Sequence, residues 1–432
     1  MATATTVSQP LTSNQIRGFL AAWGGWALDG MDSFIYALVL VPALTELLPV
    51  SGIEATPANI GAYGGILFAL FLLGWGTSMV WGPIGDRIGR VRALMLTILV
   101  YSLFTFLCAF AQNIWQLAIL RFFCGIGIGG EQPIGAAYIA EELDENRRKM
   151  GAGLMHTGYY FGFFLAAVAN YFIGANFGWR WMFILGGTPA LLIAFIRYGV
   201  HESKKWNDKF GDSEQARPKM MEAFGALFSP VYKKDTIVMS GLFLISIVLL
   251  WAGAVYVPTA TTQIAVRAGN EGPVAAQIAS YGSIILAIGT IIGCVLVPLI
   301  GERIGRPKTM ALYFTVLGVS AIFGFGYVFY LPGDVLMLFF VSVFFMGLGG
   351  ANFAVYTMWL PELYTTECRA SAIGFISSVG RFVGVALVFL LSWGISAYGS
   401  LGVPVAVVAL TFIFGLMLLP FSRDTTGQLL PE

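Results

Sequence analysis

Hydrophobic residues along this chain gather into twelve long runs separated by short polar segments. A helix needs about 20 consecutive apolar residues to cross a bilayer, and each run is close to that length. We therefore predict an all-α membrane protein with twelve transmembrane helices. The predicted spans are 18–41, 60–84, 93–112, 114–140, 152–174, 180–198, 236–258, 277–300, 309–330, 335–358, 371–395 and 402–421.

A long charged segment separates the sixth predicted helix from the seventh. Two related octapeptides, GDRIGRVR at 85–92 and GERIGRPK at 301–308, each follow the second helix of a half. Repeated halves of this kind are typical of transporters that rock around a site near the membrane midplane. We predict two pseudo-symmetric six-helix bundles, 1–199 and 235–432, joined by a cytoplasmic linker at 200–234.

Lysine and arginine are distributed unevenly over the predicted loops. If the N-terminus is cytoplasmic, 20 of the 24 Lys and Arg residues fall on the cytoplasmic side, Arg180 and Arg267 fall outside, and two more lie within spans. Cytoplasmic loops of membrane proteins carry such an excess of positive charge. We predict a multi-pass protein of the cytoplasmic (inner) membrane with both termini in the cytoplasm. The polar first residues lack the pattern of a signal peptide, so they should stay on the mature chain.

Charged residues make up only 11% of the chain, and the net charge is +1. No surface of such a chain could neutralise a row of phosphates, so we predict no nucleic-acid partner. The four cysteines show no metal-ligand spacing, and we predict neither a disulfide nor a metal site. The expected partners are the lipid bilayer, protons and a small molecule, and we expect a monomer.

No arrangement of residues in the sequence supports an enzyme. His201 lies in the linker, and His156 has no evident nucleophilic partner. Gly125, Gly127 and Gly130 have the spacing of a dinucleotide-binding loop, but they lie inside an apolar span with no βα unit before them. Close helix packing explains these glycines better. We predict no cofactor and no enzymatic activity.

Five charged side chains lie deep inside the predicted spans: Asp29, Asp32, Arg121, Glu131 and Arg381. A charge at the bilayer centre costs about 2.5–3.5 kcal/mol, so these residues predict a paired polar interior that water reaches. The rise of about 1.5 Å per residue puts Asp29 and Arg381 near the midplane, and Arg121 close to the level of Asp32. Asp29 and Asp32 are one turn apart, and we expect them to titrate as a unit. Purely structural ion pairing is the alternative.

The first octapeptide lies in the motif GPIGDRIGR, which resembles the signature loop of the major facilitator superfamily. The second copy, the run RFFCGIGIGGEQP and the loop PELYTTECR resemble the same superfamily. The resemblance implies a major facilitator fold with gating loops, although Val91 stands where the family commonly has a basic residue. The alternative is that the arginines only mark the cytoplasmic side. The expected gating residues are Gly82, Asp86, Arg87, Gly89, Arg90, Glu302, Arg303 and Arg306.

The tetrapeptide DGMD at 29–32 looks like the DGxD motif of the aromatic acid:proton symporters, and LDGMD is similar to the sialate symporter branch. Asp32 and Arg121 match the proton-coupling pair of proton-linked sugar porters, and Glu131 resembles another acid of these branches. Arg381 resembles the anion-recognising arginine of organic anion transporters. Two alternatives remain: Glu131 could only hydrogen-bond between helices, and Arg381 could pair with the acids of the first helix.

Aromatic and polar residues are expected to complete the binding site, because pockets combine aromatic walls with sparse polar groups. His156 could relay protons, although a lone histidine is more often a structural hydrogen-bonder. Ordinary packing is the alternative for each aromatic residue. The expected proton-coupling residues are Asp29, Asp32 and Glu131, and the expected substrate-binding residues are Arg121, Arg381, Tyr159, Tyr160, Trp251, Tyr256 and Asn352.

The three interior acids and two interior arginines leave one negative charge when all are ionised. An organic anion would add another, and protons on the acids would offset this charge before the loaded site moves. We predict a proton-coupled symporter that imports a small organic anion by alternating access, with an aromatic carboxylate favoured. A proton-coupled sugar or sialate symporter is the nearest alternative. A non-transporting membrane sensor is a weaker one, because the tail FSRDTTGQLLPE carries no signalling domain.

Overall fold

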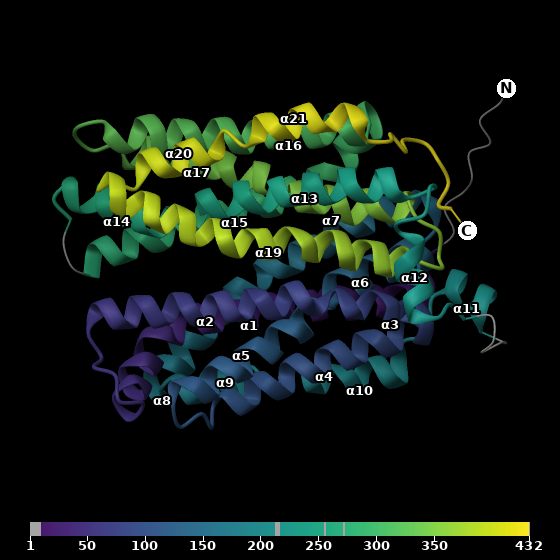
Figure 1. Cartoon of the computed structure of the whole chain (residues 1–432), viewed down its shortest axis with the longest axis horizontal. Coiled ribbons are helices and arrows are strands. Elements are labelled where there is room, and N and C mark those ends of the chain that lie inside the picture. Colours follow the sequence, from purple (N-terminus) through teal and green to yellow (C-terminus); the bar gives the residue numbers. More distant parts are fainter. Residues whose placement is uncertain (1–9, 212–216, 255, 271–272, 432) are drawn as a thin grey trace.

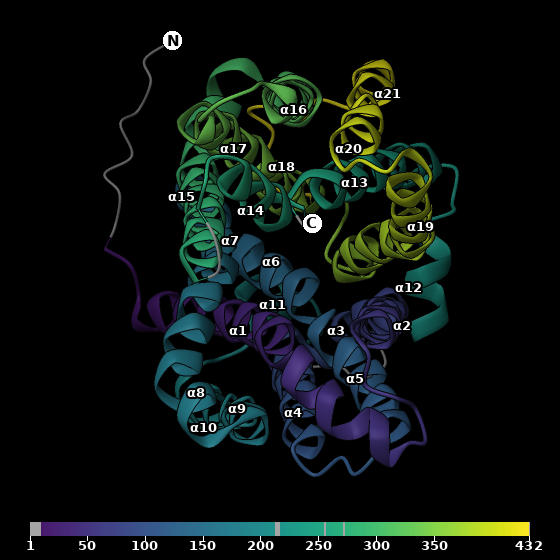
Figure 2. The same ribbon diagram turned by 90° about the vertical axis from the view of Figure 1, so that its left-hand side faces the viewer.

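The computed structural model describes residues 10–211, 217–254, 256–270 and 273–431, and the regular structure of these residues is helical. Two groups of helices lie side by side, one drawn in purple to blue and the other in teal to yellow (Figure 1). A view along the helix axes shows the same division (Figure 2). The C-terminal segment and the linker helices lie at one end, which we call the terminal face. The other end is the opposite face.

In the described part of the chain, the first group contains six helical stretches, and each overlaps one predicted span. Several stretches change helix type or bend inside the span, so that one span is built from two or three elements. The elements are α1 (Ser13–Val50), α2 (Pro57–Thr77), η1 (Ser78–Val80), α3 (Trp81–Ile88), α4 (Arg90–Cys108), α5 (Ile114–Ile128), α6 (Glu131–Glu142), α7 (Glu145–Ala169), η2 (Asn170–Gly174), α8 (Ala175–Phe177), α9 (Trp179–Leu185) and α10 (Ala190–Gly199).

Two short helices, α11 (Lys204–Phe210) and α12 (Met220–Ala226), belong to the linker. The second group again contains six stretches that coincide with the predicted spans. Its elements are α13 (Lys233–Ala254), α14 (Val257–Arg267), α15 (Pro273–Ile304), α16 (Arg306–Ala321), η4 (Ile322–Tyr327), η5 (Val328–Tyr330), α17 (Leu336–Gly350), α18 (Asn352–Trp359), η6 (Leu360–Glu362), α19 (Arg369–Tyr398), α20 (Gly402–Ala409), α21 (Phe412–Leu418) and η7 (Leu419–Phe421).

The outer surface of both groups suits hydrocarbon better than water. Within the described residues, nine helical stretches are long and apolar enough to cross a membrane by length and composition. Large apolar side chains point outward from them, including Leu191 and Met337, each 76% exposed, and Phe414, 63% exposed. Apolar surface of this extent is stable where lipid covers it.

The first helix is longer than the apolar run that predicted it, beginning at Ser13 rather than residue 18. A capping box fixes this start: the Gln15 amide donates to Thr12 Oγ1 over 3.2 Å, and the Thr12 amide donates to Gln15 Oε1 over 3.1 Å. The two bonds satisfy main-chain donors that would otherwise be unpaired at the helix end. Hydrophobicity locates the membrane part of the helix, whereas polar caps set its ends.

Glycines in α5 let this helix approach two neighbours at once. A Cβ at Gly125 would collide with the main chain of α2 at Phe71, and a Cβ at Gly127 would collide with the main chain of α4 at Tyr101. The predicted packing role of these glycines is therefore confirmed. Because α5 lies so close to α4, side chains from these two helices meet inside the first bundle.

Each half contains the same helix break at the terminal face. Gly89 has φ = 99° and Gly305 has φ = 93°, a conformation that side chains other than glycine rarely adopt. Both breaks occur inside the repeated octapeptide, between its acid and its second arginine. The break turns the chain so that Arg90 and Arg306 each begin the next helix and point back into the fold.

Candidate functional site

Asp32 of α1 and Arg121 of α5 form an ion pair inside the first bundle. Arg121 Nη1 lies 3.3 Å from Asp32 Oδ2, and both side chains are fully buried. Thr105 of α4 donates to Asp32 Oδ1 over 2.7 Å, and Cys124 donates to Oδ2 over 3.2 Å. Three donors therefore surround one carboxylate.

The Arg121 guanidinium lies between two aromatic rings. It is 4.6 Å from the centre of the Tyr36 ring and 4.5 Å from the centre of the Phe71 ring. Cation–π contact stabilises a charge that has been removed from water. Arg121 Nε and Nη2 have no hydrogen-bond partner among the described residues, so the guanidinium keeps two donors for a further group.

Asp29 and Glu131 have far fewer partners than Asp32. Neither Asp29 oxygen has a hydrogen-bond partner within the described part of the chain, although the residue is fully buried. Glu131 Oε1 is 2.6 Å from Thr97 Oγ1, and its Oε2 has no partner there. Gly25 provides the space for this carboxyl group, because a Cβ at Gly25 would collide with Glu131 Oε2. These two acids form the least satisfied part of the site.

Arg381 of α19 enters the interface from the second bundle. Its Nη1 donates to the Ser377 carbonyl over 2.5 Å, and its Nη2 donates to Gln132 Oε1 of the first bundle over 3.3 Å. The guanidinium also lies 4.4 Å from the centre of the Trp75 ring. Among the described residues no acid comes within 4 Å of it, so the alternative of direct pairing with the α1 acids is not seen in this conformation.

Two aromatic residues expected at the substrate site lie beside α1. The ring centre of Tyr159 is 4.9 Å from that of Trp26, and the ring centres of Tyr159 and Tyr160 are 5.7 Å apart. The buried His156 ring stacks on Phe353 of the second bundle at 6.4 Å. The structure thus brings these residues to the interface between the bundles, where aromatic packing surrounds His156.

The remaining predicted residues belong to the second half. Asn352 is fully buried, its Nδ2 donates to the Gly349 carbonyl over 3.0 Å, and its Oδ1 has no partner among the described residues. Tyr256 is half-buried at the start of α14. The side chain of Trp251 lies outside the described residues.

A first charged cluster joins the bundles at the terminal face. Arg90 binds Glu141 through two bonds of 3.1 and 2.9 Å, and Arg369 of the second bundle donates to the same carboxylate over 2.7 Å. Asp86 pairs with Arg90 at 2.8 Å and also caps α19, accepting bonds from the Ser371 amide at 2.9 Å and hydroxyl at 2.5 Å. All these charged side chains are fully or almost fully buried.

A second charged cluster repeats this arrangement with the bundles exchanged. Arg306 binds Glu362 through two bonds of 3.0 and 2.9 Å, and Arg148 of the first bundle donates to Glu362 over 2.9 Å. Glu302 takes the place of Asp86, pairing with Arg306 at 2.6 Å and with Lys149 at 2.7 Å. Its side chain is 40% exposed, and its contact with the first bundle is this lysine side chain. We call the two clusters together the gate cluster.

Some predicted gating residues lie away from the gate cluster. Arg87 and Arg303 are exposed, and neither forms an ion pair among the described residues, so a gating role for these two arginines stays a prediction. Each follows its acid by one residue, which turns it about 100° around the helix. Gly82 serves the interface differently, because a Cβ there would collide with the main chain of Ala370 and Ser371.

The sequence reasoning missed the acids at the centre of the gate cluster. Glu141 and Arg148 are seven residues apart in the first half, and Glu362 and Arg369 have the same spacing in the second. This repeated spacing was a signal that could have found them. Nothing in the sequence indicated that the C-terminal segment joins them, yet the Pro431 carbonyl accepts a bond of 2.6 Å from Arg369 Nη2.

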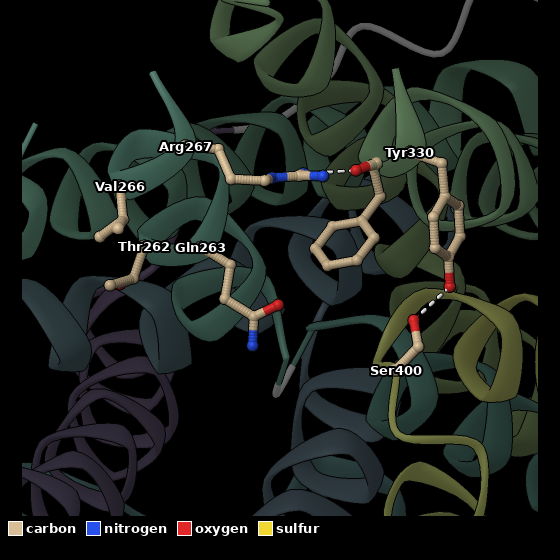
Figure 3. A pocket seen from close by; sticks show the side chains of 7 residues that line it. Thr262, Gln263, Val266, Arg267, Tyr330 and Ser400 are labelled. Atoms are coloured by element: carbon tan, nitrogen blue, oxygen red, sulfur yellow. Dashed lines mark hydrogen bonds between the residues drawn. The ribbon is translucent and has the colours of Figure 1, made fainter. Parts of the chain in front are cut away.

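A separate hollow of about 470 Å³ opens near the opposite face of the second bundle. Arg267 donates to the Phe329 carbonyl there, and the hydroxyls of Tyr330 and Ser400 are 2.5 Å apart (Figure 3). No residue predicted for the substrate site lines this hollow, so it lies apart from the buried charges. Its lining residues are Thr262, Gln263, Val266, Arg267, Phe329, Tyr330 and Ser400.

Comparison with known proteins places these features in a family. The sequence profile of the Major Facilitator Superfamily matches residues 22–387. The chain is 30% identical over 418 residues to a probable 4-methylmuconolactone transporter of Cupriavidus pinatubonensis, covering 95% of this chain and 91% of the relative. It is 28% identical to the niacin transporter NiaP of Acinetobacter baylyi, covering 84% and 83%. The structure matches the proton:xylose symporter XylE bound to 6-bromo-6-deoxy-D-glucose with a TM-score of 0.76 at 20% identity, covering 97% and 98%.

Proposed function

Because the chain belongs to the Major Facilitator Superfamily, we propose that it is a proton-coupled symporter that imports a small organic anion. It is a multi-pass membrane transporter and not an enzyme. The proposal adds the coupling ion, the substrate class and the direction to this family assignment. An aromatic or other cyclic carboxylate is the favoured substrate.

The observation that carries the proposal is the buried Arg381 guanidinium without an acidic partner among the described residues. Its hydrogen bonds to the described residues go to neutral oxygens, the Ser377 carbonyl and Gln132 Oε1. A guanidinium binds a carboxylate with two parallel hydrogen bonds. The Trp75 face beside it offers apolar contact to the body of an aromatic acid. A carboxylate is therefore the ligand that best completes this environment.

The acids of the first bundle support proton coupling. Asp29, Asp32 and Glu131 are all fully or almost fully buried, and two carboxylates close together in a dry site do not easily ionise at the same time. With two arginines nearby the ionised site carries one net negative charge, and a bound organic anion raises it to two. One or two protons on the acids would lower the cost of moving the loaded site across the membrane.

The names of the relatives agree with the proposed substrate class. Niacin and 4-methylmuconolactone, which name the transported compounds of the two relatives, are cyclic molecules that carry a carboxylic acid. Both relatives share the greater part of their length with this chain. We therefore rank aromatic and lactone carboxylates above sialate and above neutral sugars.

The gate cluster supports alternating access. Buried charges that pair across the bundles hold the terminal face closed, and they must separate when that face opens. The basic loops lie at this face, so we assign it to the cytoplasm together with both termini. The conformation with a closed gate cluster is then the one that receives substrate from outside.

Purified protein in proteoliposomes tests the proposal directly. Labelled benzoate, nicotinate, sialate and xylose are offered with and without an inward proton gradient, and the Arg381→Ala variant is measured in parallel. The proposal requires gradient-driven uptake of a carboxylate that Arg381→Ala loses. Gradient-driven uptake of xylose alone, unaffected by Arg381→Ala, would show the sugar symporter that the Asp32–Arg121 pair could also serve.

A further inference from the structure

One face of α4 carries a row of buried hydroxyl groups beside the three acids. Thr97, Tyr101 and Thr105 follow one another at intervals of four residues, and Ser102 is one turn before Thr105. All four are at most 1% exposed. The row extends about 12 Å along the helix axis, since each residue rises about 1.5 Å. We call these residues the α4 hydroxyl row.

The two ends of the row hold acids from two different helices. Thr105 Oγ1 donates to Asp32 Oδ1 of α1 over 2.7 Å. Thr97 Oγ1 lies 2.6 Å from Glu131 Oε1 of α6 and 2.8 Å from the Leu94 carbonyl oxygen. The row therefore runs from one predicted proton-coupling acid to another, entirely inside the first bundle.

The contacts at the two ends fit different protonation states. A hydroxyl has one hydrogen, and a carbonyl oxygen can only accept. When Glu131 is ionised, Thr97 donates to its Oε1; a proton on Glu131 lets the acid donate to Thr97 Oγ1, which leaves the hydroxyl hydrogen for the Leu94 carbonyl. Asp32 instead accepts from Thr105 and Cys124 and lies against Arg121. The geometry thus fits a protonated Glu131 and an ionised Asp32.

The middle of the row contains polar groups without protein partners. Tyr101 Oη and Ser102 Oγ have none among the described residues, and neither do Asp29 Oδ1, Asp29 Oδ2 and Glu131 Oε2. Tyr101 lies between Thr97 and Thr105 in the row, about one helical turn from each. Buried polar groups in such a cluster are commonly bridged by internal water, which forms two to four hydrogen bonds.

We propose that the α4 hydroxyl row, together with internal water, is the path along which a proton moves between Glu131 and the α1 acids. Tyr101 and Ser102 relay the proton, while Thr97 and Thr105 position the acids at the two ends. The proton leaves the Glu131 carboxyl group, each relay hydroxyl accepts one proton and releases one, and the α1 acid gains the proton. This path rests on the proton coupling proposed above and deepens it.

In α16 the residues four and eight positions after Tyr313 are Leu317 and Ala321, so no hydroxyl group continues from Tyr313 along that face, and this tyrosine provides a matched control. Tyr313 lies on α16, the helix that follows the second octapeptide, and its hydroxyl donates to the Gly293 carbonyl over 2.8 Å. It is fully buried, as Tyr101 is. Tyr313→Phe removes the same atom from the same kind of helix but far from the three acids.

Transport assays separate proton movement from carrier movement. For the carboxylate that the wild type accumulates best, gradient-driven uptake is compared with exchange at equal pH on both sides. We expect Tyr101→Phe to lower the ratio of driven uptake to exchange about tenfold, an effect of about 1.4 kcal/mol, and Tyr313→Phe to leave it unchanged. Ser102→Ala serves as a second variant if Tyr101→Phe does not yield folded protein.

A wild-type ratio in both Tyr101→Phe and Ser102→Ala would overturn the path and leave the proposed symport intact. Equal losses of driven uptake and exchange would also overturn it, because they indicate a purely structural role. If uptake by the wild type does not depend on the proton gradient, the proposed function is contradicted, and so is the proton path that rests on it.

Infrared spectroscopy of the protein without substrate tests the protonation states independently. We expect a carboxylic acid band that disappears in Glu131→Gln, shifts in Thr97→Val and persists in Asp32→Asn. A band that disappears in Asp32→Asn and persists in Glu131→Gln would place the proton at the other end of the row and contradict the assignment.

Discussion

Buried carboxylates at the terminal face accept hydrogen bonds from several charged donors, whereas Asp29 and Glu131 at the centre of the molecule have few partners or none among the described residues. In the gate cluster, Glu141 accepts bonds from Arg90, Arg369 and the Ser203 hydroxyl, all between 2.7 and 3.1 Å. At the centre, Asp29 accepts none within the described part of the chain. Both regions contain buried acids and arginines. They differ in the number of hydrogen-bond partners that each buried acid has.

The difference indicates what each region contributes. A buried carboxylate with several charged donors is stable in one arrangement and holds that arrangement in place. A buried polar group without a partner costs about 1–3 kcal/mol, so it persists where a ligand, a proton or water can satisfy it. The gate cluster therefore fits a lock between the bundles, and the centre fits a site that is completed during transport.

Arg381 offers the largest expected effect at the centre. Arg381→Ala should lower the transport efficiency for carboxylates about 100-fold, because truncating one partner of a buried charge pair costs about 2–5 kcal/mol. Arg381→Lys should recover only part of the loss, since an ammonium does not match a carboxylate bidentately. The measurement is initial uptake of a labelled carboxylate in proteoliposomes.

The matched control for Arg381 is Arg180→Gln. Arg180 is an arginine near the opposite face that pairs with Glu46 at 2.5 Å and is partly exposed. Its loss should leave carboxylate uptake unchanged. Equal losses in both arginine variants would remove the special role of Arg381.

The Asp32–Arg121 pair should separate accumulation from exchange. Asp32→Asn keeps the shape and the contact with Thr105 but cannot bind and release a proton. Accumulation driven by a proton gradient should disappear, while exchange of labelled for unlabelled substrate continues. Asp334→Asn, at an exposed acid in the loop before α17, is the control. Retained accumulation in Asp32→Asn would exclude this residue from coupling.

The two halves of the gate cluster should differ in strength. Asp86 accepts four hydrogen bonds, three of them from the start of α19, whereas Glu302 is 40% exposed and pairs with side chains. Asp86→Asn should therefore favour opening of the terminal face about tenfold, because hydrogen bonds to a buried charge are lost. Glu302→Gln should change the opening less than about twofold, as exposed pairs contribute about 0–1 kcal/mol.

Opening of the terminal face can be measured at Cys368, a cysteine that the chain already contains. It is buried beside the start of α19, so maleimide labelling at this residue, followed by mass spectrometry, measures how often the interface separates. Faster labelling in Asp86→Asn than in Glu302→Gln is the expected result. The reverse order would show that the exposed pair, and not the buried cap, holds the terminal face closed.

The smallest expected effect concerns the acids that cap the helices after the octapeptides. Burial raises the pKa of Glu202, whose carboxylate accepts from the Arg90 amide at 2.9 Å and the Val91 amide at 3.1 Å. Asp424 accepts from the Arg306 amide at 3.3 Å, and hydrogen bonds from Thr426 lower its pKa although burial opposes them. The two caps should therefore respond to pH in opposite directions.

The signs follow from which state binds the proton more tightly. A raised pKa in the fold means that Glu202 favours stability at low pH and loses that contribution as pH rises above the ordinary glutamate value. Asp424 contributes above the ordinary aspartate value and loses its contribution in acid. The unfolding temperature in detergent should depend less on pH above the ordinary glutamate pKa in Glu202→Gln. In Asp424→Asn it should depend less on pH below the ordinary aspartate pKa. An unchanged slope in both variants would contradict the assignment.

Much of the architecture could be predicted because lipid imposes simple rules. Apolar runs of sufficient length located the twelve helical stretches of the described residues, and the repeated octapeptides marked the ends of the second helix of each half, where the chain breaks at Gly89 and Gly305. Helix rise placed Arg121 near the level of Asp32, where the structure forms their ion pair. The start of α1 depends on the side-chain cap at Thr12, and a pattern of hydrophobic residues does not reveal such caps.

The sequence could not reveal which buried groups meet across the bundles. Gln132 contacts Arg381 and Glu141 contacts Arg369 because two surfaces far apart in the chain come together. Arg87 was expected in the gate because it lies next to Asp86, but the helix turns it outward. The hydroxyl groups of α4 looked ordinary in an apolar run, and only their position beside the acids gives them a role.

Proton-driven accumulation of a carboxylate is the most direct test of the account. Proteoliposomes containing the wild type or Arg381→Ala are given labelled benzoate or nicotinate, an inward proton gradient, and then a protonophore. The account predicts accumulation in the wild type that collapses with the protonophore and is absent in Arg381→Ala. Accumulation that persists without a proton gradient, or that does not depend on Arg381, would contradict it.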